Sequence, residues 1–168
     1  MAQVTLGGNP FPLKSEPLQE GVPAPDFHYV KDDMNDARFS DLDAPVRVIV
    51  AVPSLETPVC ANETRQFNEK LGSMNGVQAL VLSRDLPFSM KRFCSTEGIE
   101  GLAVGSDFRH REFADAYGVE IAEGPFAALL ARAVFVVADG KIVYQELVPE
   151  IGNEPDYDAV LQAIEKAR

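Results

Sequence analysis

One short loop of this 168-residue chain brings together residue types that suit thiol chemistry. The segment PSLETPVC, residues 53–60, follows an apolar run and ends in one of only two cysteines in the chain. Pro58 suits the first position of a helix, because the N–H that proline lacks is not needed there. Thr57 is then the N-cap residue and Cys60 the third helical residue. At that position, unpaired backbone N–H groups and the positive end of the helix dipole favour the thiolate over the thiol.

Two interpretations of Cys60 follow from its position alone. It is either a small apolar residue on the inner face of a helix or a nucleophilic thiolate. A strand-to-helix loop presents such a thiolate at the carboxyl edge of a sheet, where the sites of α/β proteins usually lie.

An arginine within a second apolar run favours the thiolate. Arg132 interrupts ALLARAVFVV, and strand alternation places it on the same face as Leu130 and Val134. A guanidinium on a buried strand is costly unless an anion or water satisfies it, and a thiolate would be such an anion. The alternative is that Arg132 lies on the solvent face of an edge hairpin or pairs with a carboxylate.

The second cysteine, Cys94, occurs in MKRFCSTEG, at the predicted end of a short helix. Its separation from Cys60 is neither the CxxC spacing of dithiol oxidoreductases nor that of paired metal ligands. Two cysteines and two scattered histidines, His28 and His110, are a weak set of zinc ligands. No glycine-rich phosphate loop follows a buried strand, so the sequence indicates neither a metal site nor a nucleotide site.

The apolar patterning predicts the elements that must position these residues. Residues 46–52, VRVIVAV, are nearly all apolar and β-branched, which is typical of a strand buried on both faces. The pair DG at residues 139–140 predicts a β-hairpin, and GGN at residues 7–9 indicates another near the N-terminus. The other predicted segments are strands at 27–30, 77–82, 102–104, 129–138 and 141–148, and helices at 58–71, 87–96, 109–117 and 156–166.

This order of elements predicts an α/β protein with a mixed central sheet flanked by helices. A thioredoxin-like fold with an N-terminal β-hairpin fits the pattern, although other α/β folds share it. The length suits a single domain spanning residues 1–168, which is large enough to bury a core without a disulfide or a structural metal.

The composition restricts the partners and the compartment. With 15 lysines and arginines against 26 aspartates and glutamates, the net charge is −11, which disfavours nucleic acid and anionic membranes as partners. No apolar run approaches the roughly 18 residues that indicate a membrane span. The N-terminus lacks the basic and apolar regions of a secretory signal. We therefore expect a cytoplasmic protein, in which a disulfide is more often transient and catalytic than structural.

Two motifs resemble those of the peroxiredoxins. PSLETPVC matches the P-x-x-x-T-x-x-C signature that all peroxiredoxins share. SRDLPFSMKRFC, residues 83–94, is similar to the second motif of the bacterial thiol peroxidase subfamily, S-x-D-L-P-F-A-x-x-R-[FW]-C, which is the more specific of the two. The resemblance covers almost the whole chain. Glu56 stands where aspartate is usual and Ser89 where alanine is usual, and neither belongs to the catalytic set.

The resemblance implies an atypical two-cysteine peroxidase with a thioredoxin-like fold, acting on hydrogen peroxide and organic hydroperoxides. Cys60 would be the peroxidatic cysteine, whose thiolate attacks the O–O bond and becomes a sulfenic acid. Thr57 would orient the peroxide, Arg132 would stabilise the developing negative charge, and Pro53 would shield the thiolate. Cys94 would be the resolving cysteine, forming an intrachain Cys60–Cys94 disulfide that thioredoxin reduces. No metal, haem or flavin would be required, and the subfamily usually forms homodimers.

Two other functions stay open. A thiol-disulfide reductase or isomerase on the same fold is disfavoured by the absence of CxxC. A redox sensor, in which oxidation of Cys60 changes a partner surface, is disfavoured by Thr57 and Arg132. A disulfide requires Cα atoms within about 7 Å. Because Cys60 and Cys94 lie on different predicted helices, we expect them to be apart when reduced and one or both helix ends to unwind on oxidation.

Overall fold

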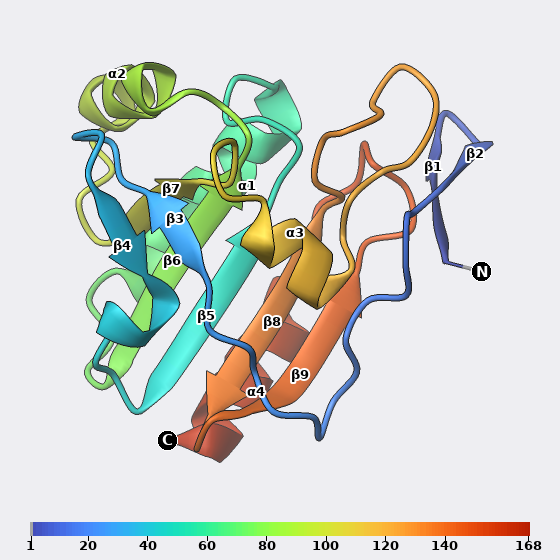
Figure 1. The fold of residues 1–168 in the computed structure, drawn as a ribbon. Helices are drawn as coiled ribbons and strands as arrows, with labels where there is room; N and C mark the ends of the chain where they lie inside the picture. The colour runs from blue at the N-terminus through green and yellow to red at the C-terminus, as the bar shows by residue number, and fades with distance from the viewer. Residues whose placement is uncertain (1) are drawn as a thin grey trace.

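A seven-stranded mixed sheet forms the centre of the computed structural model, which describes residues 2–168 (Figure 1). The strands are β1 (Gln3–Leu6), β2 (Asn9–Pro12), β3 (His28–Val30), β4 (Asp36–Arg38), β5 (Val46–Ala51), β6 (Val77–Ser83), β7 (Ala103–Ser106), β8 (Ala133–Ala138) and β9 (Lys141–Leu147). The helices are α1 (Pro58–Leu71), α2 (Pro87–Glu97), α3 (Glu112–Tyr117) and α4 (Tyr157–Ala167), with a 3₁₀ turn at Phe39–Asp41. Within residues 2–168, none of these helices has the length and apolarity needed to cross a membrane.

The sheet has parallel strands at its centre and antiparallel strands at both sides. The strand order is β4-β3-β7-β6-β5-β8-β9. β5, β6 and β7 run parallel, while β8 is antiparallel to β5 and β3 to β7. β8 and β9 are joined at the predicted DG turn, and β1 and β2 form the predicted N-terminal hairpin. The predicted α/β class, mixed sheet and N-terminal hairpin are therefore confirmed.

The central strand β5 packs side chains on both faces, as its apolar run predicts. Val48 and Val50 belong to a core cluster that contains residues of α1 and α4. Ile49 and Ala51 belong to a second cluster, which contains residues of α3. All four side chains are fully buried. Figure 1 shows α4 behind the sheet and α3 in front of it, so apolar surface is buried on both faces.

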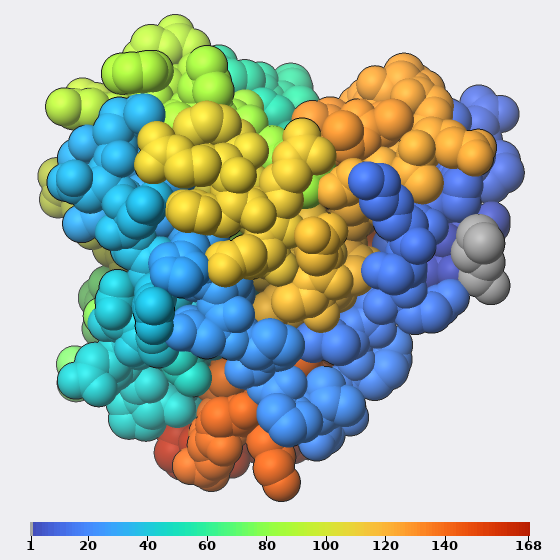
Figure 2. All heavy atoms as spheres, in the orientation of Figure 1, coloured from blue at the N-terminus to red at the C-terminus, as the bar shows by residue number. Residues whose placement is uncertain are grey.

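Aromatic side chains fill much of the second cluster. Phe113 and Tyr117 of α3 pack against Phe27, with ring centroids 5.1 and 5.6 Å from it. Tyr117 also packs against Phe135 of β8 at 5.1 Å, and its hydroxyl donates to the backbone O of Pro25 at 2.7 Å. Figure 2 shows this face closed by α3 and its neighbouring loops, in yellow, and by the N-terminal segment, in blue.

The N-terminal hairpin is anchored to the segment that follows β9. Val4 lies in a third buried cluster that includes Ala131 and Ile151. The backbone N of Thr5 donates to Pro149 O at 2.7 Å, and Ile151 N donates to Thr5 O at 2.8 Å. The hairpin therefore supports the chain next to Ala131 and Ile151.

The predicted helix at residues 109–117 is shorter in the structure and begins at Glu112. Arg111 has a φ of 59°, in the left-handed region, which interrupts helical geometry before that point. The carboxylate of Asp107 accepts from Phe113 N at 3.3 Å. This capping interaction from outside the helix is not visible as a local pattern.

The predicted strand at residues 129–138 also begins later, at Ala133. Residues 128–131 pair with residues 119–121 instead of extending the sheet, with Ala131 N donating to Val119 O at 2.8 Å. Strand alternation therefore does not extend back from Val134. Leu130 packs in the second cluster and Val134 in the first, so the prediction that both share a face was wrong.

Candidate active site

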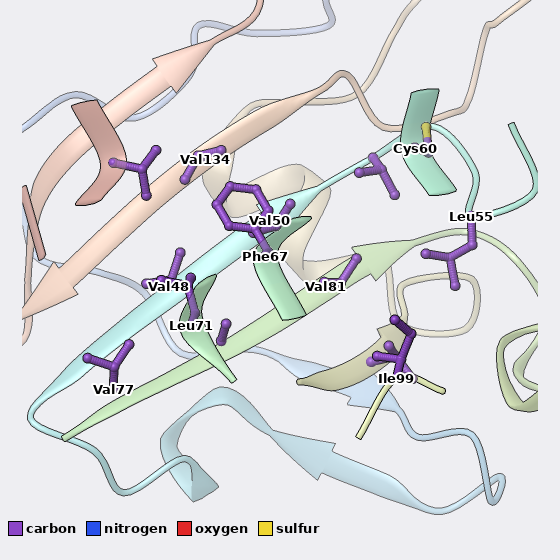
Figure 3. Close-up of a cluster of buried hydrophobic side chains, with 14 of the residues drawn as sticks. Val48, Val50, Leu55, Cys60, Phe67, Leu71, Val77, Val81, Ile99 and Val134 are labelled. Atoms are coloured by element: carbon purple, nitrogen blue, oxygen red, sulfur yellow. The ribbon is translucent and has the colours of Figure 1, made fainter. Parts of the chain in front are cut away.

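Cys60 lies in the first turn of α1, directly after the carboxyl end of β5, as the loop sequence predicts. Thr57 is the N-cap residue: its Oγ1 accepts from Cys60 N at 3.2 Å and donates to Ser54 O at 3.4 Å. Pro53 is buried at the start of the loop. The Cys60 side chain is fully buried, and Figure 3 shows it at one end of the first core cluster, which also contains Leu55.

The structure brings Arg132 next to Cys60. Arg132 is only 2% exposed, and its Nη1 donates to the Sγ of Cys60 at 3.2 Å. Nε and Nη2 donate to the backbone O of Ile151 at 3.2 and 2.9 Å. Burial alone would lower the pKa of Arg132, but attraction to Glu63 and to Cys60 outweighs it and raises that pKa. The site therefore holds a permanent cation against the sulfur, and Arg132 does not lie on a solvent-exposed face.

A buried glutamate that the sequence patterns did not single out completes this cluster. Glu63 is fully buried, and its Oε1 accepts from Arg132 Nη1 at 2.7 Å. Its Oε2 has no hydrogen-bond partner among residues 2–168. Burial outweighs the attraction of Arg132 and raises the pKa of Glu63 to about 7. A signal was present, because residues three apart share a helix face, so Glu63 was predictable on the same face of the helix as Cys60.

Asp85 supports the loop before Cys60 and was likewise not predicted as an individual site residue. Its carboxylate accepts from Ser54 Oγ at 2.7 Å and from Leu55 N at 2.8 Å. Asp85 lies within the second motif, but only the tertiary structure connects that motif to the first one.

Cys94 lies in α2 in a different environment from Cys60. It is half-buried and lines a pocket of about 180 Å³ with Tyr29, Lys31 and Asp32 among the other lining residues. Burial, with a contribution from the negative charge of Asp32, raises the pKa of Cys94 to about 11. Both cysteines are free thiols in this structure. The Cys60–Cys94 disulfide therefore stays a prediction.

A shallow pocket opens beside the first turn of α1. It has a volume of about 330 Å³ and is lined by Pro58, Val59 and Asn62 of the helix and by residues 152–154. The latter follow Ile151, whose carbonyl binds Arg132. This pocket therefore lies beside the helical turn that carries Cys60, and Cys60 itself does not line it.

The two histidines each contact a carboxylate side chain. His28 Nδ1 lies 2.9 Å from Glu112 Oε2, and His110 Nε2 lies 2.8 Å from Asp36 Oδ1. Within residues 2–168, no group of three or more His, Cys, Asp or Glu side chains has the arrangement of a metal site.

Comparison with known proteins identifies the family. The Redoxin family model matches residues 19–161. A thiol peroxidase of Leptospira interrogans is 49% identical over 99% of both chains. A thiol peroxidase of Campylobacter jejuni is 49% identical over 93% of this chain and 89% of that protein. The chain belongs to the thiol peroxidases. This peroxiredoxin-type oxidoreductase therefore reduces peroxides in a thiol-dependent reaction.

A solved structure supports the fold of this thiol peroxidase. A peroxiredoxin-like protein from Aquifex aeolicus superposes with a TM-score of 0.94 at 44% identity, covering 99% of this chain and 97% of that one. The predicted resemblance to the bacterial thiol peroxidase subfamily is confirmed, and with it the thioredoxin-like fold.

Proposed function

We propose that Cys60 is the peroxidatic cysteine and Cys94 the resolving cysteine of this thiol peroxidase, and that thioredoxin recycles the enzyme. The observation that carries the proposal is the contact between the Arg132 guanidinium and the Cys60 sulfur at 3.2 Å, inside a buried site. A buried cation stabilises a thiolate and an attacked peroxide oxygen more strongly than it would in water.

The first step is attack of the Cys60 thiolate on one oxygen of the peroxide. A sulfur–oxygen bond forms and the O–O bond breaks, so that the sulfur is oxidised to a sulfenic acid. The electron pair of the O–O bond leaves on the second oxygen, which takes up a proton and departs as water or an alcohol. Arg132 stabilises the charge on both oxygens, Thr57 orients the peroxide, and Pro53 shields the thiolate.

The second step joins the two cysteines. The Cys94 sulfur attacks the Cys60 sulfur, an S–S bond forms, and the S–O bond breaks with release of water that carries the Cys94 proton. The raised pKa of Cys94 keeps it a thiol in the reduced state, which leaves the reaction with peroxide to Cys60. The dithiol of thioredoxin then reduces the disulfide and is itself oxidised. We expect one or both helix ends to unwind as the sulfurs meet.

Both hydrogen peroxide and organic hydroperoxides are proposed substrates. Leu86 and Phe88 at the start of α2 are 54% and 69% exposed, directly after Asp85 in the chain. Their apolar side chains suit an alkyl group. The further proposals are a single domain over residues 1–168, a homodimer and a cytoplasmic location.

Substitution of each cysteine by serine tests the two roles. Cys60→Ser should abolish turnover with thioredoxin, because an alkoxide is not available at neutral pH. Cys94→Ser should consume one equivalent of peroxide per chain and then stop. Steady-state rates with hydrogen peroxide and an alkyl hydroperoxide measure both effects. Unchanged turnover in Cys60→Ser would contradict the proposal.

A further inference from the structure

One carboxylate connects the loop before Cys60 to the start of the helix that carries Cys94. Asp85 lies between the end of β6 and the start of α2. Its Oδ1 accepts from Ser54 Oγ at 2.7 Å, and its Oδ2 accepts from Leu55 N at 2.8 Å. Ser54 and Leu55 form the part of the loop that turns β5 into α1. The position of the Cys60 helix start therefore depends on a residue of the loop that follows the neighbouring strand β6.

Two buried serines hold the same aspartate from the sheet side. Ser83 Oγ donates to Asp85 Oδ2 at 2.6 Å and accepts from Asp85 N at 3.2 Å. Ser106 Oγ donates to Asp85 O at 2.6 Å. Both serines are fully buried at the ends of the parallel strands β6 and β7. Asp85 is thus fixed to the rigid sheet edge on one side and to the reactive loop on the other.

The connection continues directly into α2. Leu86, the residue after Asp85, is the N-cap of that helix. A second link, the ion pair between Glu56 and Arg92 at 2.9 Å, has side chains that are 48% and 69% exposed. Exposed pairs of this kind contribute little. Asp85 is therefore the stronger of these two links between the loop and α2.

We propose that Asp85 is a positioning residue of the peroxidase, which holds residues 53–57 in the arrangement that reacts with peroxide. This inference rests on the proposed function, because it assigns Asp85 an effect on steps that Cys60 and Cys94 perform. Without the carboxylate, the Thr57 hydroxyl and the Cys60 sulfur lose their fixed place relative to Arg132. The proposed disulfide step unwinds one or both helix ends, so loss of Asp85 should not slow it.

The test separates the two chemical steps in single turnovers. Asp85→Ala removes all three side-chain contacts, and Asp85→Asn keeps the shape but only one accepting oxygen. We expect Asp85→Ala to slow peroxide consumption about ten- to hundredfold, and Asp85→Asn to slow it less. The rate of disulfide formation, measured by quenching the reaction and counting free thiols, should be unchanged or faster in both variants. The matched control is Asp43→Asn, because Asp43 is an exposed aspartate just before β5. Its rates of both steps should equal those of wild type.

Two outcomes would overturn the role of Asp85. One is a rate of peroxide consumption in Asp85→Ala that lies within twofold of the wild-type rate. The other is an equal fold decrease in the rates of peroxide consumption and disulfide formation in Asp85→Asn. That result would indicate that Asp85 only stabilises the fold. Failure of the proposed function is distinguishable, because it appears as turnover in Cys60→Ser or as normal recycling in Cys94→Ser. Neither of these results depends on Asp85.

Discussion

Two arginines are buried at the same edge of the sheet, and they have partners of different chemistry. Arg132 precedes β8, and its Nη1 binds the Cys60 sulfur and the Glu63 carboxylate. Arg84 follows β6, and its side chain is 6% exposed. Its Nη2 lies 2.6 Å from Glu120 Oε1 and 3.4 Å from Asp107 Oδ2. Arg132 thus contacts the sulfur of a thiol, whereas the partners of Arg84 are two carboxylates and the backbone O of Ala128.

The comparison shows that a buried guanidinium does not by itself indicate a reactive site. The Arg84 cluster joins the ends of β6 and β7 to the segment that carries Glu120, and Lys14 adds a second cation to Glu120. These groups can exchange protons but cannot reduce a peroxide. The Arg132 cluster contains the Cys60 sulfur, and in the proposed function this partner performs the chemistry with peroxide.

The largest expected difference is in the rate of peroxide consumption, between the single variants Arg132→Lys and Arg84→Lys. Arg132→Lys keeps a charge but cannot contact the sulfur, Glu63 and Ile151 O at the same time, so peroxide consumption should fall about 10²–10³-fold. Arg84→Lys should leave the rate within a few-fold of wild type and mainly lower the free energy of unfolding. Single-turnover kinetics and urea unfolding of both variants measure this. Equal rate losses in the two variants would remove the distinction.

The two clusters should also differ in the pH range over which they affect stability. Burial raises the pKa of Glu63 from 4.5 to about 7, and that of Asp107 from 3.8 to about 6 against the attraction of Arg84. In each case the folded state keeps its proton to a higher pH than the unfolded chain. The contribution to the free energy of unfolding is therefore greatest below the unfolded pKa, and it falls as pH rises to the folded pKa.

Replacing each carboxylate by a neutral amide should remove its own part of the fall in unfolding free energy with rising pH. Glu63→Gln should flatten the fall in unfolding free energy between about pH 4.5 and 7, and Asp107→Asn should flatten it between about pH 3.8 and 6. Each effect is expected to amount to a few kcal/mol at most. Urea unfolding across pH 4–8 provides the measurement. A slope that persists in Glu63→Gln from pH 6 to 7 would show that another group causes it.

The smallest expected effect belongs to the outermost charge of the Arg84 cluster. The Lys14 side chain is 56% exposed, so solvent screens its ion pair with Glu120. Lys14→Ala should lower the free energy of unfolding by less than about 1 kcal/mol and leave peroxide consumption unchanged. A larger loss would mean that Lys14 is as important to this cluster as Arg84 is.

The clusters also differ in how visible they were in the sequence. Arg132 stood out because it interrupts an apolar run, and a reactive partner was predictable. Arg84 lies in a polar stretch after a strand, where an arginine needs no explanation. Its partners Asp107 and Glu120 come from other segments, 23 and 36 residues away. No local pattern reports pairings over such distances.

The sequence by itself predicted most of the elements and drew attention to the loop before Cys60. The strand at Val46–Ala51, the DG hairpin and the Thr57-Pro58 helix start each leave a pattern within a short stretch of sequence, so periodicity, turn residues and capping preferences reveal them. The second motif likewise indicated the subfamily, because all of its residues lie in one short segment of the chain.

Only the tertiary structure decided which side chains complete the site. Glu63 meets Arg132 across 69 residues of sequence, and Asp85 meets Leu55 across 30. The fully buried state of Cys60 likewise results from packing of segments distant in the chain. The physical reason is that burial and hydrogen-bond pairing depend on where the sheet brings chain segments together. Local propensities carry no information about that.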